Sequence, residues 1–464
     1  MSKRLLALPA LALLAGCSMM PDYLRPAAPV PAAWPEPANV KVSPGGTASI
    51  AAEDWRRVFT EPQLQALIAA ALEHNRDLRI AVARVAEARA LAGVAAADQL
   101  PTVDVNFQRA ASLTPGDLSA TGRQLNAQRY DANLGVAAFE LDFWGRVGSL
   151  DAAARASFLA SDYARQAFRL SLIADVANGW FSLLELEERS ALAAATALSR
   201  GETRRLIDKR REVGLASDLD FLAADGAWAS ARAEAASLAR QRTAAENALR
   251  LLVGDDGALA ARRVPASLAV GELPVGLPAE VLLKRPDVLA AEQRLVAANA
   301  NIGAARAAFL PRIALTASAG TASRALSGLF GAGSGAWAFA PVLKWPLFDG
   351  GRAESNTDLA EARKTVAVAE YEKAIQQAFR EVADLLAART GYAEQLAALE
   401  AAATAQAERE QRVDARYRAG VSSQLELLDA QRESFATRHA ALAARRAWLG
   451  TLASLYKALG AVEP

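Results

Sequence analysis

The last quarter of the chain, residues 351–460, has a regular spacing of apolar positions. In its second part every seventh residue is a large apolar one: Leu428, Phe435, Leu442, Leu449 and Tyr456. A seven-residue repeat keeps one side of a helix against a partner helix, as in a coiled coil. The neighbouring stripe is partly filled by Leu425, Leu452 and Leu459. The pattern predicts a helix that packs lengthwise against another helix.

The first part of this stretch is too long for a globular core. It runs from Gly351 to Gly420 without proline, and Gly391 is its only internal glycine. At 1.5 Å per residue, about 70 helical residues extend about 100 Å. Gly420 and the serines after it predict a turn into the return helix. Residues 351–460 are therefore expected to form a long helical hairpin that needs neighbours.

Two other stretches have a two-residue period, which is typical of β-strands. Val103, Val105 and Phe107 alternate with polar residues, and a similar alternation continues through residues 130–136, 313–317 and 337–345. Strands of about ten residues suit a tilted transmembrane strand, but a soluble hairpin with one buried face has the same pattern. The sequence predicts β-hairpins at about 102–141 and 312–346.

Aromatic residues lie where the predicted strands end and helices begin. They are Phe143, Trp144, Trp345 and Phe348. Such residues form belts at membrane interfaces, but they also pack the joint between a strand and a helix. The sequence leaves both interpretations open.

The chain contains an internal repeat. Several matching residues lie 206 positions apart: Arg146 and Arg352, Gly214 and Gly420, Ser217 and Ser423, and Gly254 and Gly460. Residues 61–264 and 265–464 are therefore predicted to be two repeats, with helical hairpins at 145–254 and 351–460. Four strands cannot close a barrel, and open sheet edges do not occur in lipid. If these strands cross a membrane, several copies of the chain must contribute strands.

The amino-acid composition excludes several classes of function. The 464 residues carry a net charge of +1, with one Cys, two His and three Met. This balance does not indicate nucleic acid binding, and a single Cys excludes an internal disulfide framework. So few soft ligands leave little for a transition-metal site. We expect no metal and no cofactor.

The N-terminus carries a targeting signal. Lys3 and Arg4 precede an apolar run at residues 5–15, which is too short to span a bilayer and is typical of a signal peptide. The run ends in Leu-Ala-Gly-Cys, which resembles the bacterial lipobox, so Cys17 is expected to carry lipid. Ser18 in place of Asp favours the outer membrane. We predict a signal peptide at 1–16 and a lipidated, Pro-rich tether at 17–60.

Several longer motifs carry a family resemblance that extends over nearly all of the mature chain. They are Pro21–Pro26, Phe59–Leu64, His74–Leu78, the run from Arg285-Pro286-Asp287-Val288 to Pro311, and Pro346–Arg352. With these motifs the chain resembles the outer membrane factor family, the TolC/OprM-type, NodT-like lipoproteins of efflux systems.

The resemblance implies a homotrimer with a 12-stranded β-barrel in the outer membrane and a long α-helical barrel, built from coiled-coil helices, in the periplasm. It implies a passive exit duct for small molecules such as drugs or toxic compounds, without enzyme activity. The implied partners are a periplasmic adaptor and an inner-membrane transporter of the proton-driven RND class.

The resemblance also suggests roles for residues near the turns. Gly214, Ser217, Gly420 and Ser423 would form the tips that contact the adaptor, although glycines also simply end helices. Arg416, Tyr417, Leu425 and Asp429 would form a periplasmic gate. In it Asp429 and Leu425 would face the duct, and Arg416 and Tyr417 would tie neighbouring helices through hydrogen bonds. The first repeat has Ala223 at the position of Asp429, so only one type of hairpin would carry the gate.

Two other functions agree with part of this pattern. A lipid-anchored periplasmic coiled-coil scaffold or adaptor would explain the heptads and the lipid, but not two strand pairs at matching points of a repeat. An envelope enzyme would need a nucleophile motif, a phosphate loop or a metal cluster, and the sequence shows none. His74 and His439 stand alone, and a solvated or packing role suits each.

Overall fold

The computed structural model describes residues 18–31, 55–255, 257 and 279–460. The expected signal peptide at 1–16 and Cys17 lie outside the described residues. The chain divides into two compact units. One, the strand unit, comprises residues 1–27, 84–162 and 290–372; the other, the helical unit, comprises residues 28–83, 163–289 and 373–464.

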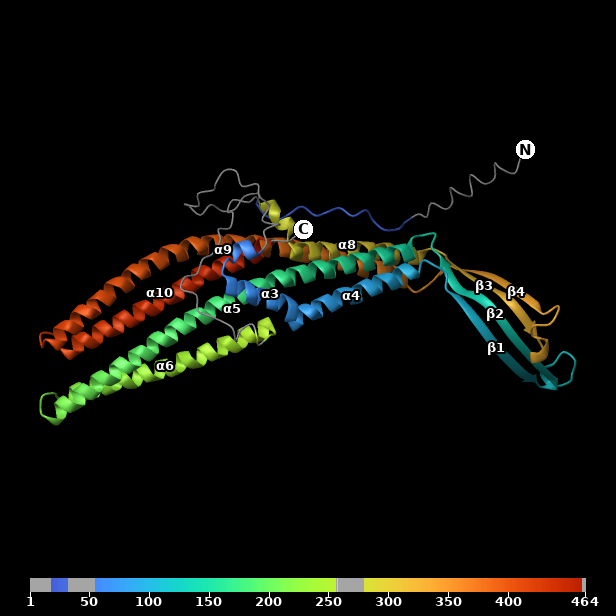
Figure 1. Cartoon of the computed structure of the whole chain (residues 1–464). Helices are drawn as coiled ribbons and strands as arrows, with labels where there is room; N and C mark the ends of the chain where they lie inside the picture. Colours follow the sequence, from blue (N-terminus) through green and yellow to red (C-terminus); the bar gives the residue numbers. More distant parts are fainter. Residues whose placement is uncertain (1–17, 32–54, 256, 258–278, 461–464) are drawn as a thin grey trace. The chain divides into compact units, whose positions relative to one another are not determined.

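The strand unit contains a sheet of four antiparallel strands in the order β1-β2-β3-β4. The strands are β1 (Val103–Thr114), β2 (Leu125–Leu141), β3 (Arg312–Ser323) and β4 (Gly335–Lys344). Figure 1 shows them side by side. The strands lie where the two-residue period predicted them, and β2 and β3, which are far apart in sequence, pair directly.

One face of this sheet is apolar. The strand register places two rows across it: Val105, Leu134, Ala319 and Trp337, and Val103, Val136, Ala317 and Phe339. Trp337 is 80% exposed and Val105 63%. Large apolar side chains thus cover a broad surface that no part of the described chain buries.

The opposite face carries small and polar residues. One row across it is Asn106, Asn133, Gly320 and Ala336. A Cβ on Gly320 would overlap the backbone oxygen of Ala132, so glycine at this position permits β2 and β3 to approach. The sheet is two-faced, with one face suited to an apolar solvent and the other to water.

Long helices make up most of the rest. The helices are α2 (Trp55–Val58), α3 (Pro62–His74), α4 (Arg76–Ala97), α5 (Arg146–Glu212), α6 (Asp218–Val253), α8 (Pro286–Arg306), α9 (Arg352–Arg418) and α10 (Gln424–Ala458). Both α5 and α9 have 67 residues, or about 100 Å of helix. In the described residues no helix is both long and apolar enough to cross a membrane.

Part of the core of the helical unit is built on α3, which packs against α6. Leu67 and Ile68 are fully buried, and the rings of Phe59 and Tyr456 meet edge to face with centroids 5.6 Å apart. Helix α2 falls inside the range 17–60 that the sequence assigned to the tether, and its Trp55 is buried. This part of the tether range therefore belongs to the core.

The heptad positions of α10 are buried to different degrees. Leu449 and Tyr456 are buried, whereas Leu428 and Phe435 are only half-buried. Near the turn the buried residue is instead Leu427, which packs with Val413 of α9. An α-helix has 3.6 residues per turn, so a strict seven-residue stripe drifts around a straight helix.

Arg285 joins three helices of the helical unit. Its guanidinium donates hydrogen bonds to Asp287 at 2.8 and 3.0 Å, to Glu381 of α9 at 2.9 Å and to the backbone oxygen of Ala458 at 2.6 Å. The side chain is 5% exposed. It lies just before α8 and connects that helix to the middle of α9 and the end of α10.

The part of the predicted tether nearest Cys17 lies along α8 in the strand unit. Asn299 donates to the backbone oxygen of Pro21 at 2.7 Å, and Glu292 accepts hydrogen bonds from Tyr23 at 3.1 Å and from Arg25 at 2.6 and 2.7 Å. Glu292 is buried. This segment has no regular secondary structure, yet the strand unit holds it by specific hydrogen bonds.

Candidate functional site

The two long helices end in the same type of turn. At Gly214 φ is +78° and at Gly420 it is +76°. The N–H of Leu215 donates to the backbone oxygen of Arg210 at 2.7 Å, and that of Val421 donates to Arg416 at 2.9 Å. A glycine in the left-handed region with such a hydrogen bond ends helices because it satisfies carbonyls that would otherwise be unpaired. A Cβ would meet nothing within 4 Å at either glycine, so conformation alone requires glycine.

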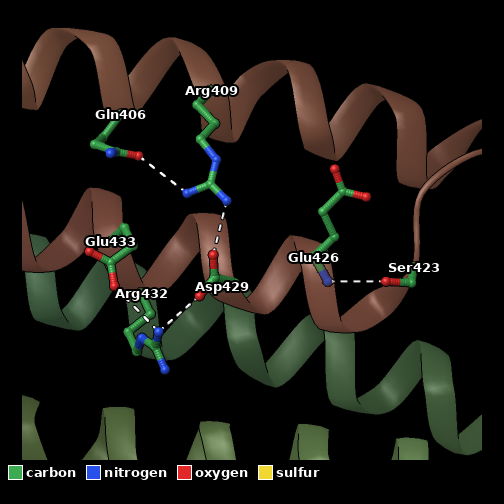
Figure 2. Close-up of polar contacts among 7 residues, drawn as sticks. All are labelled: Gln406, Arg409, Ser423, Glu426, Asp429, Arg432 and Glu433. Carbon is green, nitrogen blue, oxygen red and sulfur yellow. Dashed lines mark hydrogen bonds and ion pairs between the residues drawn. The ribbon is translucent and has the colours of Figure 1, made fainter.

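A serine begins each return helix. Ser217 accepts a hydrogen bond from the N–H of Asp220 at 3.1 Å, and the Asp220 carboxylate accepts one from the Ser217 hydroxyl at 2.8 Å. Hydrogen bonds from the hydroxyl and the N–H of Ser217 lower the pKa of Asp220 below its ordinary value. Ser423 caps α10 by accepting from the N–H of Glu426 at 3.2 Å (Figure 2). All four predicted tip residues thus have local roles in helix termination or capping.

The turns expose apolar side chains. Among them are Leu215 (78%), Leu219 (78%), Val421 (68%) and Leu425 (77%). Exposed leucines near both turns are not explained by packing within the chain. They make the turns a candidate interaction surface.

Asp429 lies at the centre of a charged cluster on the α9–α10 hairpin. Its two carboxylate oxygens accept hydrogen bonds from Arg409 of α9 at 2.9 Å and from Arg432 at 2.8 Å (Figure 2). Arg432 also approaches Glu433 at 3.3 Å. The Asp429 side chain is 40% exposed, so water screens these ion pairs.

Sequence reasoning missed Arg409. Arg409 and Asp429 each lie ten residues from Ala419, next to the turn. In an antiparallel helical hairpin, residues equally far from the turn are neighbours, so this spacing was a usable signal.

The structure does not bring the four predicted gate residues together within one chain. Tyr417 packs against Val413 and Leu427 of its own hairpin, and the guanidinium of Arg210 lies 6.0 Å from its ring. The side chains of Arg416 and Leu425 are exposed.

His439 lies between α10 and α5. Its Nδ1 accepts a hydrogen bond from Arg189 at 3.3 Å, and its ring lies 4.1 Å from that of Phe435. Burial and then the positive charge of Arg189 lower the pKa of His439 to about 4. An ion pair between Glu188 and Arg445 also joins these two helices. His439 is therefore a neutral packing residue at physiological pH.

The sequence that forms these strands and helical hairpins matches a known protein family. Residues 67–255 and 277–461 match the outer membrane efflux protein family. The chain belongs to this family.

Individual relatives of known name support the same family membership. Over 450 residues the chain is 43% identical to the outer membrane protein OprJ of Pseudomonas aeruginosa, covering 96% of this chain and 93% of OprJ. It is 42% identical over 468 residues to the toluene efflux pump outer membrane protein TtgI of Pseudomonas putida, covering 97% and 96%.

A solved membrane protein of Pseudomonas aeruginosa is 41% identical, with a TM-score of 0.87 over 96% of this chain and 100% of that one. The open MtrE outer membrane channel of Neisseria gonorrhoeae is 37% identical, with a TM-score of 0.84 over 96% and 99%. This chain is thus an outer membrane efflux channel protein. Its family and its relatives are transport channels.

Proposed function

We propose that three copies of this chain form the passive exit duct of a tripartite efflux pump. The single observation that carries the proposal is the two-faced sheet. Its apolar face is exposed and its outer strands β1 and β4 each have a partner on one side only. Open edges are not stable in lipid. Three copies would supply 12 strands, enough to close a barrel with the apolar face outward and the row of Asn106 and Asn133 toward water.

The helices also fit an assembly of three copies. In each copy α5 with α6 and α9 with α10 form two hairpins, and three copies would form a tube of 12 helices. The shared order of strand pair, 67-residue helix, turn and return helix in both halves supports two repeats, at residues 61–264 and 265–464. Tubes of this length would cross the periplasm.

The exposed turns fit a docking role. Leu215, Leu219, Val421 and Leu425 would meet a periplasmic adaptor, which would connect the duct to an inner-membrane transporter of the RND class. Energy would come from that transporter, since a duct performs no chemistry. The tips at Gly214, Ser217, Gly420 and Ser423 would hold these apolar side chains in position.

The substrates would be small organic molecules. The relatives' names include a toluene pump, a solvent pump and an antibiotic pump. By analogy, this duct would carry apolar or amphipathic drugs and toxic compounds. Lipid on Cys17 would anchor the chain to the outer membrane, and mass spectrometry of the N-terminal peptide tests this directly.

The gate would lie on the α9–α10 hairpins. Three copies of Asp429 in a narrow ring would repel one another and hold cations. Arg409 would balance part of this charge, because its ion pair with Asp429 joins the two helices of the hairpin. Leu425, one turn earlier, would narrow the opening, and Arg416 and Tyr417 would bind neighbouring helices.

Single-channel conductance in planar bilayers tests both the duct and the gate. Asp429→Ala and Arg416→Ala should raise the conductance above that of the wild type. The matched control is Asp225→Ala, which removes the ion pair of Asp225 with Arg204 inside the first hairpin and should leave conductance unchanged. A heat-resistant trimer with no channel activity in any variant would refute the duct. A channel whose conductance the two gate variants leave unchanged would refute only the gate.

A further inference from the structure

The two helical hairpins differ inside, although they share the 206-residue offset. In the first hairpin Trp228 of α6 lies between two arginines, with the guanidinium of Arg232 4.8 Å and that of Arg204 5.1 Å from its ring. A Cβ on Gly201 of α5 would lie 3.0 Å from the indole nitrogen. Glycine at this position therefore makes room for the ring.

An ion pair and two further arginine–aromatic contacts also join α5 to α6. Arg204 forms an ion pair with Asp225 of α6 and also lies 5.1 Å from the ring of Phe221. Arg211, two turns nearer the tip, lies 4.1 Å from the Phe221 ring. Cation–π contacts and an ion pair thus join α5 to α6.

The second hairpin has other residues at four of the matching positions. Ser434 replaces Trp228, Gln431 replaces Asp225, Glu410 replaces Arg204 and Ala407 replaces Gly201. Ser434 is 1% exposed. In the described part of the chain its hydroxyl has no hydrogen-bond partner, and neither has the side-chain oxygen of Gln431.

A cavity of about 190 Å³ borders Ser434 and lies between α5, α9 and α10. Besides Ser434, its lining includes Leu192, Arg200, Glu410, Gln431, Phe435 and Arg438. Four of its residues, Ser199, Glu410, Gln431 and Arg438, also line a larger groove of about 750 Å³. The cavity therefore has a route to solvent.

We propose that this cavity binds a small neutral aromatic compound that carries an N–H or O–H group. A cavity of roughly 150 Å³ is enough for benzene, so one ring with a polar substituent fits the volume. Arg438 occupies the position of Arg232, which already lies over an aromatic ring in the first hairpin. Arg200 adds a second cation to the lining.

The polar groups that line the cavity determine which polar substituent the ligand would carry. The Ser434 hydroxyl and the Gln431 oxygen are buried and can accept a hydrogen bond, and buried groups of this kind gain stability from a partner. Glu410 balances one of the two arginine charges in the lining, and its carboxylate can also accept a hydrogen bond from a donor on the ligand. The ligand would supply a ring and an N–H beside Ser434, which has no indole of its own as its counterpart Trp228 has. This inference rests on the fold and not on the duct function.

Titration of 5-fluoroindole with the full-length protein in detergent, followed by ¹⁹F NMR, tests the proposal. Ser434→Trp fills the cavity from within and serves as the matched control, because micelle binding is the same for both proteins. We expect saturable line broadening with the wild type and an affinity lower by at least about tenfold with Ser434→Trp. Gln431→Leu, which keeps the cavity but removes the acceptor, should also weaken binding.

Two further probes distinguish the recognised features. Fluorobenzene has the aromatic ring without the donor, and a fluorinated cyclohexanol has the donor without an aromatic ring, so both should bind more weakly than 5-fluoroindole. Equal titrations for the wild type and Ser434→Trp would overturn the proposal. If Ser434→Trp does not fold, Ser434→Leu, with a smaller side chain, takes its place with the same expected loss and the same overturning result.

Discussion

Replacement of Arg285 by alanine tests the packing of the helical unit at its most connected point. The change removes four donated hydrogen bonds: two to Asp287, one to Glu381 and one to the backbone oxygen of Ala458. The end of α10 loses its charged link to α8 and α9. We therefore expect the last turns of α10 to open more often, while α5 and α6 keep their packing.

The magnitude follows from burial. Removing one partner of a buried ion pair costs about 3–5 kcal/mol because the other charge stays unpaired. Here Asp287 is 45% exposed and Glu381 35%, so water can solvate both carboxylates once Arg285 is gone. We reduce the expected cost to about 2–3 kcal/mol, which corresponds to an opening equilibrium about 30- to 150-fold larger.

Hydrogen exchange measured by mass spectrometry reads this opening directly. Peptides that contain Leu455 and Tyr456, both buried, should exchange faster in Arg285→Ala by that factor. The matched control is Arg380→Ala on α9, whose pair with Asp384 spans 3.9 Å with both side chains more than 70% exposed. It should change exchange by less than about threefold. If the two variants exchange alike at the end of α10, Arg285 does not hold these helices together.

Three further predictions concern other sites. Glu292→Gln should lower the pKa of Tyr23 from about 12, a value raised by burial and then by the charge of Glu292, which titration of tyrosinate absorbance against a Tyr23→Phe blank would detect. His439 has a folded pKa of about 4, below its unfolded value of about 6.5. The unfolded chain therefore binds the proton first, and stability should fall by about 1–2 kcal/mol from pH 6.5 to 4 after allowance for solvent screening; His439→Gln should remove that slope in thermal melts. Gly254→Ala should lower the melting temperature more than Gly420→Ala, since both glycines have positive φ but only at Gly254 would a Cβ meet backbone, at 2.7 Å from the oxygen of His74; equal shifts would contradict this.

Much of the secondary structure was predictable because its signals are local. The two-residue period placed the strands, the absence of proline placed α9, the internal repeat placed α5, and glycine marked both turns at Gly214 and Gly420. Glu61 accepts hydrogen bonds from the N–H groups of Gln63 and Leu64, and Pro62 after it suits the first position of a helix, so the start of α3 is also encoded locally. Such signals need only a few neighbouring residues, and they act before the chain folds.

The candidate site was less predictable. The family resemblance pointed to Asp429, but its partner Arg409 became visible only when α9 and α10 lay side by side. Arg285 was part of the most specific sequence motif, yet its contacts with Glu381 and Ala458 join residues 96 and 173 positions away. Nothing in the sequence singled out Glu292 within the same run, although it holds Tyr23 and Arg25.

The sequence by itself determined the periods, the turns and the family, because helix and strand preferences and matching motifs lie in short stretches of chain. Only the tertiary structure decided which charges meet, which face of the sheet is apolar along all four strands, and that Ser434 borders a cavity where its counterpart Trp228 is packed. These features depend on contacts between distant segments. Their energies arise when folding removes the groups from water and places them within reach of one another.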